Sequence, residues 1–295
     1  MLIEDRLKNE DFSYNEELII QYILDQKSAI RTMTMRDIAN ATFTSPATMS
    51  RIAHKLNYSG WETLKADYLK ELEYLESQVS EIDANQPFNK EDSLLTIATK
   101  ISVLKKESID DTLSLIKQDD LRKSVNILEK ADLIHIFGVR QNALIAQSFK
   151  HNLMQIQKHA EIHSIQGQMM FDAYQARSSS CAIILSYSGE TRTLVQCAKY
   201  LKEHQVPIIS ITSIGNSTIS SLSSCNLRIC TREKQFSKIA SFSTDVSIIY
   251  LLEVLYSCLF TQNYDKNWKS KVSPSFDIEQ DKTTRITLGI IKEKD

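Results

Sequence analysis

Apolar residues in the N-terminal part of the chain recur at helical spacing and are preceded by residues that can start helices. Ser13 stands three residues before Glu16, which is the pattern of a capping box. Thr34 and Asp37 repeat this signal with an acidic partner. The pattern predicts two short helices, each beginning directly after its hydroxyl residue.

A third helix and a longer one complete this region. Ser45 can cap a helix whose first position is Pro46, because proline loses no hydrogen bond there. The buried face of this third helix carries Met49, Ile52, Ala53 and Leu56. The longer amphipathic helix has apolar residues at Trp61, Leu64, Tyr68, Leu72 and Leu75. Residues 78–90 contain Pro87 and little periodicity, which indicates a linker before a helical stretch at 93–117.

From Asp132 onward, short apolar runs rich in β-branched residues alternate with helical stretches. The candidate strands are residues 133–138, 160–165, 181–186, 206–212 and 226–230. Such alternation is typical of a parallel sheet covered by helices on both faces. We therefore predict an α/β protein: an N-terminal all-α helix-turn-helix module followed by a doubly wound domain with a five-stranded parallel sheet.

Nothing in the pattern indicates a membrane protein. The densest apolar run, 246–260, contains Ser247, Glu253 and Ser257 and is shorter than a span of about 20 apolar residues. The N-terminus alternates apolar and charged residues and has no signal-peptide pattern. We expect a cytoplasmic protein without a membrane partner. The polar tail at 266–295 has one β-prone patch, 285–291, and we expect it to be flexible.

Composition and charge set limits on the function. A chain of 295 residues has room for two domains of ordinary size. Its formal net charge of -2 means that nucleic-acid binding requires a local basic face.

Cysteine and histidine spacing indicates no metal or disulfide site. The five cysteines form no CxxC pair, and the six histidines form no HExxH pair. We expect buried free thiols and no cofactor.

The third predicted helix has an informative second face. Opposite its apolar residues the chain places small, hydroxyl-bearing or basic residues, and with the helix cap they are Ser45, Ala47, Thr48, Ser50, Arg51, His54 and Lys55. A helix that enters the major groove between phosphates needs such a face. The surrounding segment is locally basic, with Lys27, Arg31, Arg36, Arg51, Lys55, Lys65 and Lys70. The alternative is a solvated face on an ordinary three-helix bundle.

These residues resemble the helix-turn-helix of RpiR-type bacterial transcription regulators. The matching positions are Ser45, Ala47, Thr48, Arg51, Lys55, Leu56, Tyr58, Gly60 and Lys65. The sequence departs from the family pattern at Ile52, Asn57 and Trp61. Asn57 replaces a helix-ending glycine, and asparagine tolerates the left-handed conformation that this position requires.

Hydroxyl residues gather where two predicted strands end and helices begin. Residues 186–191 hold Ser186, Ser188, Gly189 and Thr191. Residues 212–218 repeat the pattern after the next strand. Because strand ends of a parallel sheet share one edge and helix N-termini offer free amides, this edge can cradle a phosphate. The alternative is a polar loop with a serine cap.

The segment 186–191 also resembles the phosphate-binding signature of sugar isomerase (SIS) domains. This resemblance implies that Ser186, Ser188, Gly189 and Thr191 bind a phosphosugar. The stretch 241–260 resembles the final SIS helix, where Ser241 could reach the sugar, although helix capping is the simpler role. A helix-turn-helix followed by a SIS domain is the architecture of RpiR-type regulators.

The first loop of the sheet departs from the family pattern. SIS domains of this type commonly have Gly-x-Gly-x-Ser there, whereas this chain has Gly138, Arg140 and Asn142 at the three positions. Either Arg140 supplies a charge to the phosphate, or the altered loop has weakened effector binding.

SIS domains also occur in isomerases, so an enzyme is the alternative function. Isomerisation needs a base in the pocket. The candidates are Glu190, His151, His159, His163 and Glu253, and none lies in a recognisable catalytic pattern. A phosphosugar-binding protein without operator function is a further alternative.

The residues and the resemblance together predict a transcriptional regulator without catalytic residues, with double-stranded operator DNA and a phosphorylated sugar effector as partners. Because one small helix-turn-helix makes few contacts, we expect a homodimer or homotetramer. The predicted domains are 1–77 (helix-turn-helix), 78–107 (linker and connecting helix), 108–265 (SIS) and 266–295 (tail).

Overall fold

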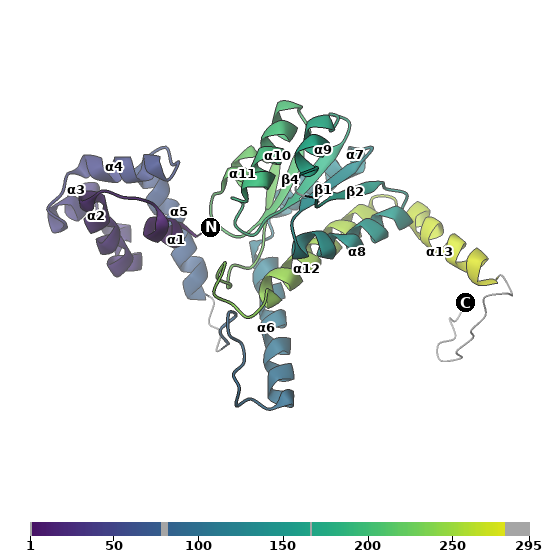
Figure 1. Cartoon of the computed structure of the whole chain (residues 1–295), viewed down its shortest axis with the longest axis horizontal. Coiled ribbons are helices and arrows are strands. Elements are labelled where there is room, and N and C mark those ends of the chain that lie inside the picture. The colour runs from purple at the N-terminus through teal and green to yellow at the C-terminus, as the bar shows by residue number, and fades with distance from the viewer. Residues whose placement is uncertain (1, 78–81, 166, 281–295) are drawn as a thin grey trace.

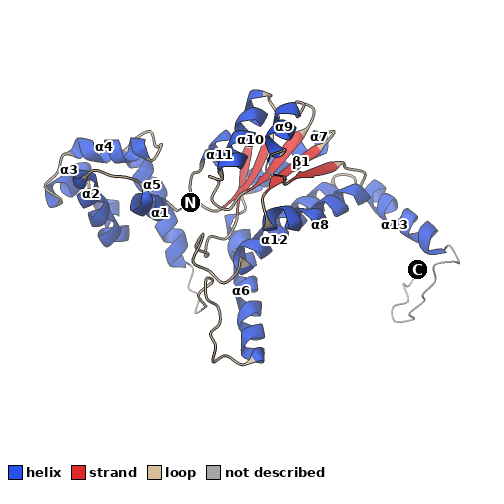
Figure 2. Cartoon of the chain, in the orientation of Figure 1, coloured by secondary structure: helices blue, strands red, loops and turns tan. Residues whose placement is uncertain are grey.

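The structure is a computed structural model that describes residues 2–77, 82–165 and 167–280. A helical bundle formed by the N-terminal residues lies beside a larger domain of helices and strands (Figures 1 and 2). In Figure 1 the long helix α6 (Leu94–Leu115) projects downward from the larger domain, and α13 (Tyr264–Gln280) extends from its right side.

The N-terminal bundle contains every helix that the pattern predicts, and two short elements besides. Its elements are α1 (Ile3–Asn9), α2 (Tyr14–Gln26), the 3-10 helix η1 (Lys27–Thr32), α3 (Met35–Ala41), α4 (Pro46–Lys55) and α5 (Trp61–Ser77). Ser13 and Thr34 form the predicted capping boxes with Glu16 and Asp37. The hydrogen bonds from Thr34 lower the pKa of the Asp37 carboxyl.

The core of the bundle consists of the apolar stripes of these helices. Its fully buried members include Ile19, Ile38, Met49, Ile52 and Leu64. The chain leaves α4 through Asn57, whose φ of 62° is the left-handed conformation that the sequence predicts. Burial of these stripes against one another, at roughly 25 cal/mol per Å² of apolar surface, holds the short helices together.

The larger domain begins with α6 (Leu94–Leu115) and α7 (Gln118–Lys130). Helix α6 crosses the domain boundary that the sequence places between residues 107 and 108. It is fixed to the chain beyond the last strand by the Arg232 guanidinium, which pairs with Asp111 and, at 2.6 Å, with Glu107.

The sheet has the five predicted strands. They are β1 (Ile134–Gly138), β2 (Ala160–His163), β3 (Cys181–Leu185), β4 (Ile208–Thr212) and β5 (Cys225–Arg228). All neighbours are parallel, in the order β2-β1-β3-β4-β5. The order reverses at β1 and β3, and in such sheets ligands bind beyond the carboxyl ends of the strands near this point.

Helices cover both faces of the sheet, as the alternation predicts (Figure 2). On one face, apolar side chains of α7, α8 (Gln141–Gln155) and α12 (Phe242–Thr261) pack against the sheet. On the other, α9 (Met169–Gln175), α10 (Arg192–Glu203) and α11 (Thr218–Leu222) do so. Four of the five cysteines are buried free thiols in this domain, and Cys258 is half-buried.

Helix α12 is long and apolar enough to cross a membrane by length and composition. Its residues Ile248, Leu251, Leu255 and Leu259 are instead buried in the core of the larger domain. The helix is therefore a core element of this fold.

The expectation of a flexible tail is wrong for its first half. Residues 264–280 form α13 (Tyr264–Gln280). The Asn267 side chain donates a hydrogen bond to the Phe260 carbonyl, and the rings of Phe260 and Tyr264 meet edge to face. These contacts continue α12 into α13. The β-prone patch 285–291 lies outside the described residues.

Candidate functional site

Helix α4 presents an exposed, basic face. The Ser45 hydroxyl accepts a hydrogen bond from the Ala47 amide, and both residues are exposed. Arg51 and His54 are also exposed, and Ser50 is half-buried. The face therefore has the length and chemistry of a surface that contacts a DNA groove.

Thr48 does not belong to this face, and the expectation that it is exposed is wrong. It is 1% exposed, because it lies one turn before Ile52 on the side of α4 that packs into the bundle. Its hydroxyl accepts a hydrogen bond of 2.9 Å from the Arg51 guanidinium. Thr48 therefore orients Arg51 and is not placed to touch a base.

Lys55 is exposed but turns back onto α2. Its ammonium donates to the Asp11 carbonyl, lies 3.7 Å from the Glu16 carboxylate and sits over the Phe12 ring. Burial by itself would raise the pKa of Glu16, but hydrogen bonds from Ser13 and the charge of Lys55 hold that pKa below its usual value. The Lys55 charge is thus partly used within the bundle.

The turn between α3 and α4 carries an exposed aromatic residue to which the sequence pattern assigns no role. Phe43 is 98% exposed, and its φ is 54°. A bulky side chain in left-handed backbone is rare, and such outliers gather at functional sites. The signal in the sequence is an aromatic residue within the polar turn that precedes the Ser45 cap.

The loop after β3 is held by its own hydroxyl groups. Ser186 is buried, and its hydroxyl accepts the Gly189 amide at 3.2 Å and lies 3.4 Å from the Thr191 hydroxyl. The Ser188 hydroxyl accepts the Glu190 amide at 3.2 Å. Thr191 is the N-cap residue of α10 and makes no side-chain cap hydrogen bond. The loop thus places the α10 N-terminus, which favours anions, at the carboxyl edge of the sheet.

Gly189 is required by a close approach to the next loop. Its φ is 65°, and a Cβ there would lie 2.1 Å from the Ser217 hydroxyl oxygen. The Ile219 amide also donates to the Gly189 carbonyl, and the Thr218 amide donates to the Glu190 carboxylate. The two hydroxyl-rich loops predicted from the sequence therefore pack directly on each other.

The loop after β1, which departs from the family pattern, has a strained backbone at Arg140. A Cβ on Gly138 would lie 3.3 Å from the Ala143 amide nitrogen, so the first glycine is needed for close packing. Arg140 is exposed with φ 53° and ψ −125°, a conformation that favours glycine. The Asn142 side chain donates to the Leu185 carbonyl at 3.1 Å. Asn142 therefore ties this loop to the end of β3.

A cavity of about 470 Å³ opens at the carboxyl edge of the sheet. Its lining comes from the loops after β3, β4 and β5 and from the N-terminus of the chain: Leu2, Tyr187, Ser188, Ser213, Thr231, Glu233, Lys234, Gln235, Phe236 and Ser237. Of the eight predicted ligand residues, Ser188 lies in this lining and the other seven do not. The segment 231–237, which follows the last strand, carries no sequence motif that predicts a role in this lining.

Ser241 does not cap α12. It stands at the N-cap position, but its side chain makes no cap hydrogen bond. The Glu233 carboxylate takes that role, accepting the Ser243 amide at 2.5 Å, the Thr244 amide at 3.2 Å and the Thr244 hydroxyl at 2.7 Å. Lys238 pairs with the same carboxylate at 2.7 Å.

The candidate catalytic bases do not converge on this cavity. Glu190 and His151 are exposed and bond to Thr218 and Gln155, respectively. His163 lies on β2, at the far edge of the sheet from β4 and β5, and Glu253 lies in a groove between α8 and α12. Glu233 lines the cavity, but its carboxylate is bonded to the start of α12 and to Lys238.

The loop after β4 also contacts the N-terminal bundle. The Asn216 side chain donates to the Asp67 carboxylate on α5 at 2.8 Å. On α5 the Glu71 carboxylate accepts the Ile3 amide at 2.7 Å, which holds the start of α1 beside Leu2 and the cavity. The same loop thus contacts Gly189 on one side and α5 on the other.

Comparison with known proteins assigns both parts of the chain to families. Residues 1–74 match the helix-turn-helix domain of the rpiR family, and residues 127–257 match the SIS domain. An uncharacterized HTH-type transcriptional regulator of Caldanaerobacter subterraneus is 23% identical over 88% of this chain and 90% of its own length.

Three solved structures share the fold. The Vibrio vulnificus NanR protein complexed with ManNAc-6P is 23% identical, with a TM-score of 0.61 over 93% of this chain and 97% of that one. The sugar isomerase domain of an RpiR transcription factor from Sphaerobacter thermophilus (16%, TM-score 0.54) covers 61% of this chain and 98% of its own. A putative sugar-phosphate isomerase of Listeria monocytogenes (15%, TM-score 0.53) covers 63% and 97%.

Proposed function

We propose that this chain, which belongs to the rpiR family of helix-turn-helix transcriptional regulators and carries a SIS domain, binds operator DNA through α4 under control of a phosphorylated sugar. The observation that carries the proposal is the loop after β4. It packs on the hydroxyl-rich loop at the ligand edge and bonds to α5 of the DNA-binding bundle. One short segment therefore contacts both functional parts.

DNA binding is proposed for the exposed face of α4. Ser45 and Ala47 stand at the helix N-terminus, where backbone amides can meet a phosphate, and Ser50, Arg51 and His54 follow along the helix. Lys55 contributes a charge at the C-terminal end of α4 that Glu16 partly neutralises. The Thr48 hydroxyl orients Arg51 by accepting its hydrogen bond. Phe43 adds an apolar contact beside the helix start.

Ligand binding is proposed for the carboxyl edge of β1, β3 and β4. Ser188 contributes directly to the cavity, and Thr191 with the α10 N-terminus provides donors for a phosphate. Ser186, Gly189, Gly138 and Asn142 shape the two loops by internal hydrogen bonds and close packing. Arg140 offers a guanidinium to the phosphate from the exposed rim. Ser241, which does not cap α12, remains available to a sugar. The NanR relative with its bound ManNAc-6P supports a phosphorylated sugar as the class of ligand.

A homodimer or homotetramer in the cytoplasm is part of the proposal. A dimer presents two α4 helices to two half-sites, which multiplies the contacts of one small module. Exposed apolar side chains on α8, α12 and α13 offer a surface for self-association: Leu144, Met154, Ile249, Trp268 and Val272. We also propose that the helix-turn-helix domain ends at residue 77. The expected boundaries at 107 and 265 fall within α6 and α13, so we propose that the domain with the SIS fold begins with α6.

The alternative function, phosphosugar isomerisation, finds support in the SIS fold, which the Listeria putative sugar-phosphate isomerase shares. Against it stands Glu233, the carboxylate nearest the cavity, because its oxygens are already bonded to α12 and Lys238. Chromatography of each sugar phosphate after incubation with the protein separates the two functions. A regulator returns the sugar unchanged.

The ligand is tested by thermal denaturation against a panel of sugar phosphates. A ligand present at 100 times its dissociation constant should stabilise the fold by about 2.7 kcal/mol. The matching unphosphorylated sugars are the control and should give no shift. If no sugar phosphate raises the melting temperature, the proposed effector class is wrong.

The DNA interface is tested with duplexes selected from a random pool by the full-length protein. Arg51→Ala should weaken binding by roughly 1 to 3 kcal/mol if Arg51 contacts a base. Lys55→Ala should cost less, because Asp11 and Glu16 already hold the ammonium. If the double variant Arg51→Ala, His54→Ala binds like wild type with unchanged helicity, α4 is not the recognition helix.

A further inference from the structure

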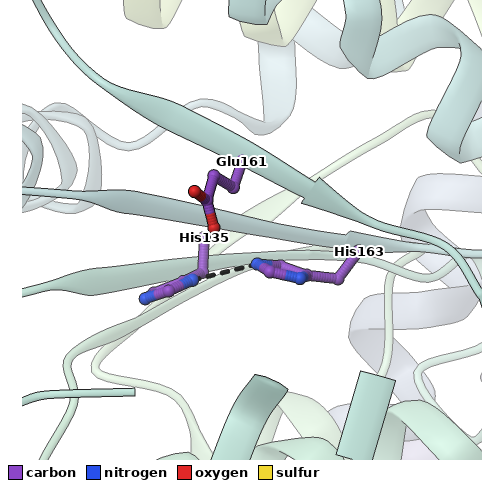
Figure 3. Close-up of side chains that lie close together, drawn as sticks. All are labelled: His135, Glu161 and His163. Atoms are coloured by element: carbon purple, nitrogen blue, oxygen red, sulfur yellow. Dashed lines mark hydrogen bonds between the residues drawn. The ribbon is translucent and has the colours of Figure 1, made fainter. Parts of the chain in front are cut away.

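The edge of the sheet away from the ligand cavity holds a compact cluster of metal-ligating side chains. His135 on β1 and Glu161 and His163 on β2 each offer one ligand atom, and these three atoms lie within 4.8 Å of one another (Figure 3). The His135 Nδ1 and the His163 Nε2 are 2.9 Å apart. Figure 3 shows the Glu161 carboxylate pointing toward the imidazoles.

The register of two parallel strands assembles this cluster. His135 pairs with Glu161 and Phe137 pairs with His163, so the side chains share one face of the sheet. Because the residues come from different strands, no short sequence motif announces the site. The spacing of the histidines along the sequence, from which we expect no metal site, therefore does not reveal this cluster.

A fourth residue orients His163 in the manner of a metal ligand. The Asp172 carboxylate on α9 lies 2.8 Å from the His163 Nδ1 and accepts a second hydrogen bond from Gln168 at 3.1 Å. An imidazole that donates its Nδ1 proton to a carboxylate turns the lone pair of Nε2 outward. Metal-ligating histidines are commonly held by such a carboxylate. In this structure that lone pair faces His135 and Glu161.

We propose that His135, Glu161 and His163 bind a divalent transition-metal ion, with zinc the best match, and that Asp172 positions His163. Two imidazole nitrogens and one carboxylate oxygen suit zinc, whereas calcium and magnesium prefer oxygen ligands alone. Zinc–nitrogen bonds of about 2.0 to 2.1 Å in a tetrahedral site place two ligand nitrogens about 3.3 Å apart. The observed 2.9 Å needs only a small opening of the pair.

The ion would stabilise the edge of the sheet. Strand β2 is an edge strand with one neighbour, β1, and the site joins the two, while Asp172 connects it to α9. His135 also stands on the strand that leads into Gly138 and Arg140. Occupancy of the site would therefore fix the strand that carries the first ligand loop.

The alternative is a hydrogen-bonded chain from His135 through His163 to Asp172 that needs no ion. A metal site would bind one metal ion per protein chain, whereas a hydrogen-bonded chain alone would bind none stoichiometrically. The experiment uses full-length, tag-free protein stripped with a chelator. Zinc is then added from a chelating buffer, and bound metal and affinity are measured by elemental analysis and calorimetry.

We expect one zinc per chain in the wild-type protein. Glu161→Gln, at an exposed position, should weaken zinc binding at least tenfold, and His163→Gln should abolish it. Asp172→Asn should weaken it by about 10- to 100-fold. His151→Gln removes an exposed histidine outside the cluster and should leave the affinity unchanged.

Cobalt provides a second readout. A cobalt ion in a tetrahedral site absorbs visible light strongly, whereas an octahedral cobalt ion bound adventitiously at the surface absorbs it weakly. The proposal is overturned if wild-type protein binds no stoichiometric zinc, or if Glu161→Gln and His163→Gln bind it like wild type. Since these measurements require neither DNA nor a sugar phosphate, their outcome is independent of the proposed regulatory function.

Discussion

At the scale of single residues, six residues other than glycine in the described part of the chain have positive φ, and two of them lie beside the proposed binding surfaces. Phe43 and Arg140 have φ of 54° and 53°, and both side chains are exposed. For an L-residue other than glycine, a sparsely populated backbone conformation with positive φ costs roughly 1 to 3 kcal/mol. Neither residue recovers this cost by burial, so each is a candidate for a contact made outside the free chain.

We predict that Phe43→Gly raises stability and lowers DNA affinity. Relief of the strained backbone exceeds the entropic cost of glycine, so the free energy of unfolding should rise by about 0.5 to 1 kcal/mol. Denaturant unfolding and fluorescence anisotropy measure the two effects. Asn57→Gly is the matched control, because Asn57 is also exposed and left-handed but follows α4, and it should leave DNA affinity unchanged. Equal DNA affinity of Phe43→Gly and wild type would exclude the contact.

For Arg140 we predict a role in phosphate binding. Arg140→Ala should lose affinity for phosphorylated ligands by about 1.5 to 3 kcal/mol, and Arg140→Lys should recover only part of it, because lysine lacks the planar guanidinium. Calorimetry with the sugar phosphate found by thermal denaturation provides the measurement. Arg192→Ala, which removes an exposed arginine from the first turn of α10, is the comparison. Unchanged affinity in Arg140→Ala would mean that the altered loop serves only to close the pocket.

At the scale of elements, the start of α12 shows how a distant residue replaces a local cap. Glu233 carries its carboxylate to the first amides of α12, while the local Ser241 makes no cap bond. A second carboxyl, Asp245, lies in the first turn, and one of its oxygens is buried without a hydrogen-bond partner. Burial, and then the charge of Glu233, raises the pKa of Asp245 to about 6.

This pKa gives a pH-dependent prediction for Asp245→Asn. Between about pH 4 and 6 the unfolded chain loses the Asp245 proton while the folded chain retains it, so this group destabilises the fold progressively as pH rises. Above about pH 6 the penalty is constant. The asparagine side chain does not titrate, so Asp245→Asn should be more stable than wild type at about pH 7.5, by about 1 kcal/mol after allowance for solvent screening, and equally stable below about pH 4.

Urea unfolding at about pH 4, 5, 6 and 7.5 measures this difference. Glu253→Gln, which removes an exposed carboxyl from the same helix, should show no such growth with pH. A stability difference between Asp245→Asn and wild type that stays constant over the whole range would contradict the assignment.

At the scale of the whole molecule, the two functional parts meet at few points. Asn216 bonds to Asp67 on α5, and Leu2 reaches the cavity at the carboxyl edge of the sheet. A ligand can alter DNA binding only if it binds one arrangement of the two parts better than another. The loop after β4 is placed to transmit the effect of ligand binding to the DNA-binding bundle, because it packs on Gly189 and bonds to α5.

We therefore predict that Asn216→Ala reduces the coupling between the two ligands. Affinity for the sugar phosphate should stay within about twofold of wild type, while the change in DNA affinity on adding the sugar phosphate should shrink. Anisotropy titrations with and without the effector measure this coupling. Asn263→Ala, in the exposed turn between α12 and α13, is the control and should leave it intact. Full coupling in Asn216→Ala would show that another contact transmits the effect.

Features that depend on neighbours along the chain could be predicted from the residues alone. The capping boxes at Ser13 and Thr34, the left-handed Asn57 and the five strands follow from hydrogen bonds within a few residues and from the period of apolar positions. The same local patterns identified both families. They missed α1 and α13, which have no comparable start signal and rest on contacts with other helices.

Which side chains meet depends on how the helices and strands pack on one another. Thr48 is buried because α4 turns that side toward the bundle, and Lys55 is held by α2, although both share a helix with exposed Arg51. Glu233 caps α12 from a distant loop, and strand register joins His135 to His163. The period of apolar positions fixes the direction in which a side chain points from its own helix or strand. The packing of one element on another then fixes what that side chain touches.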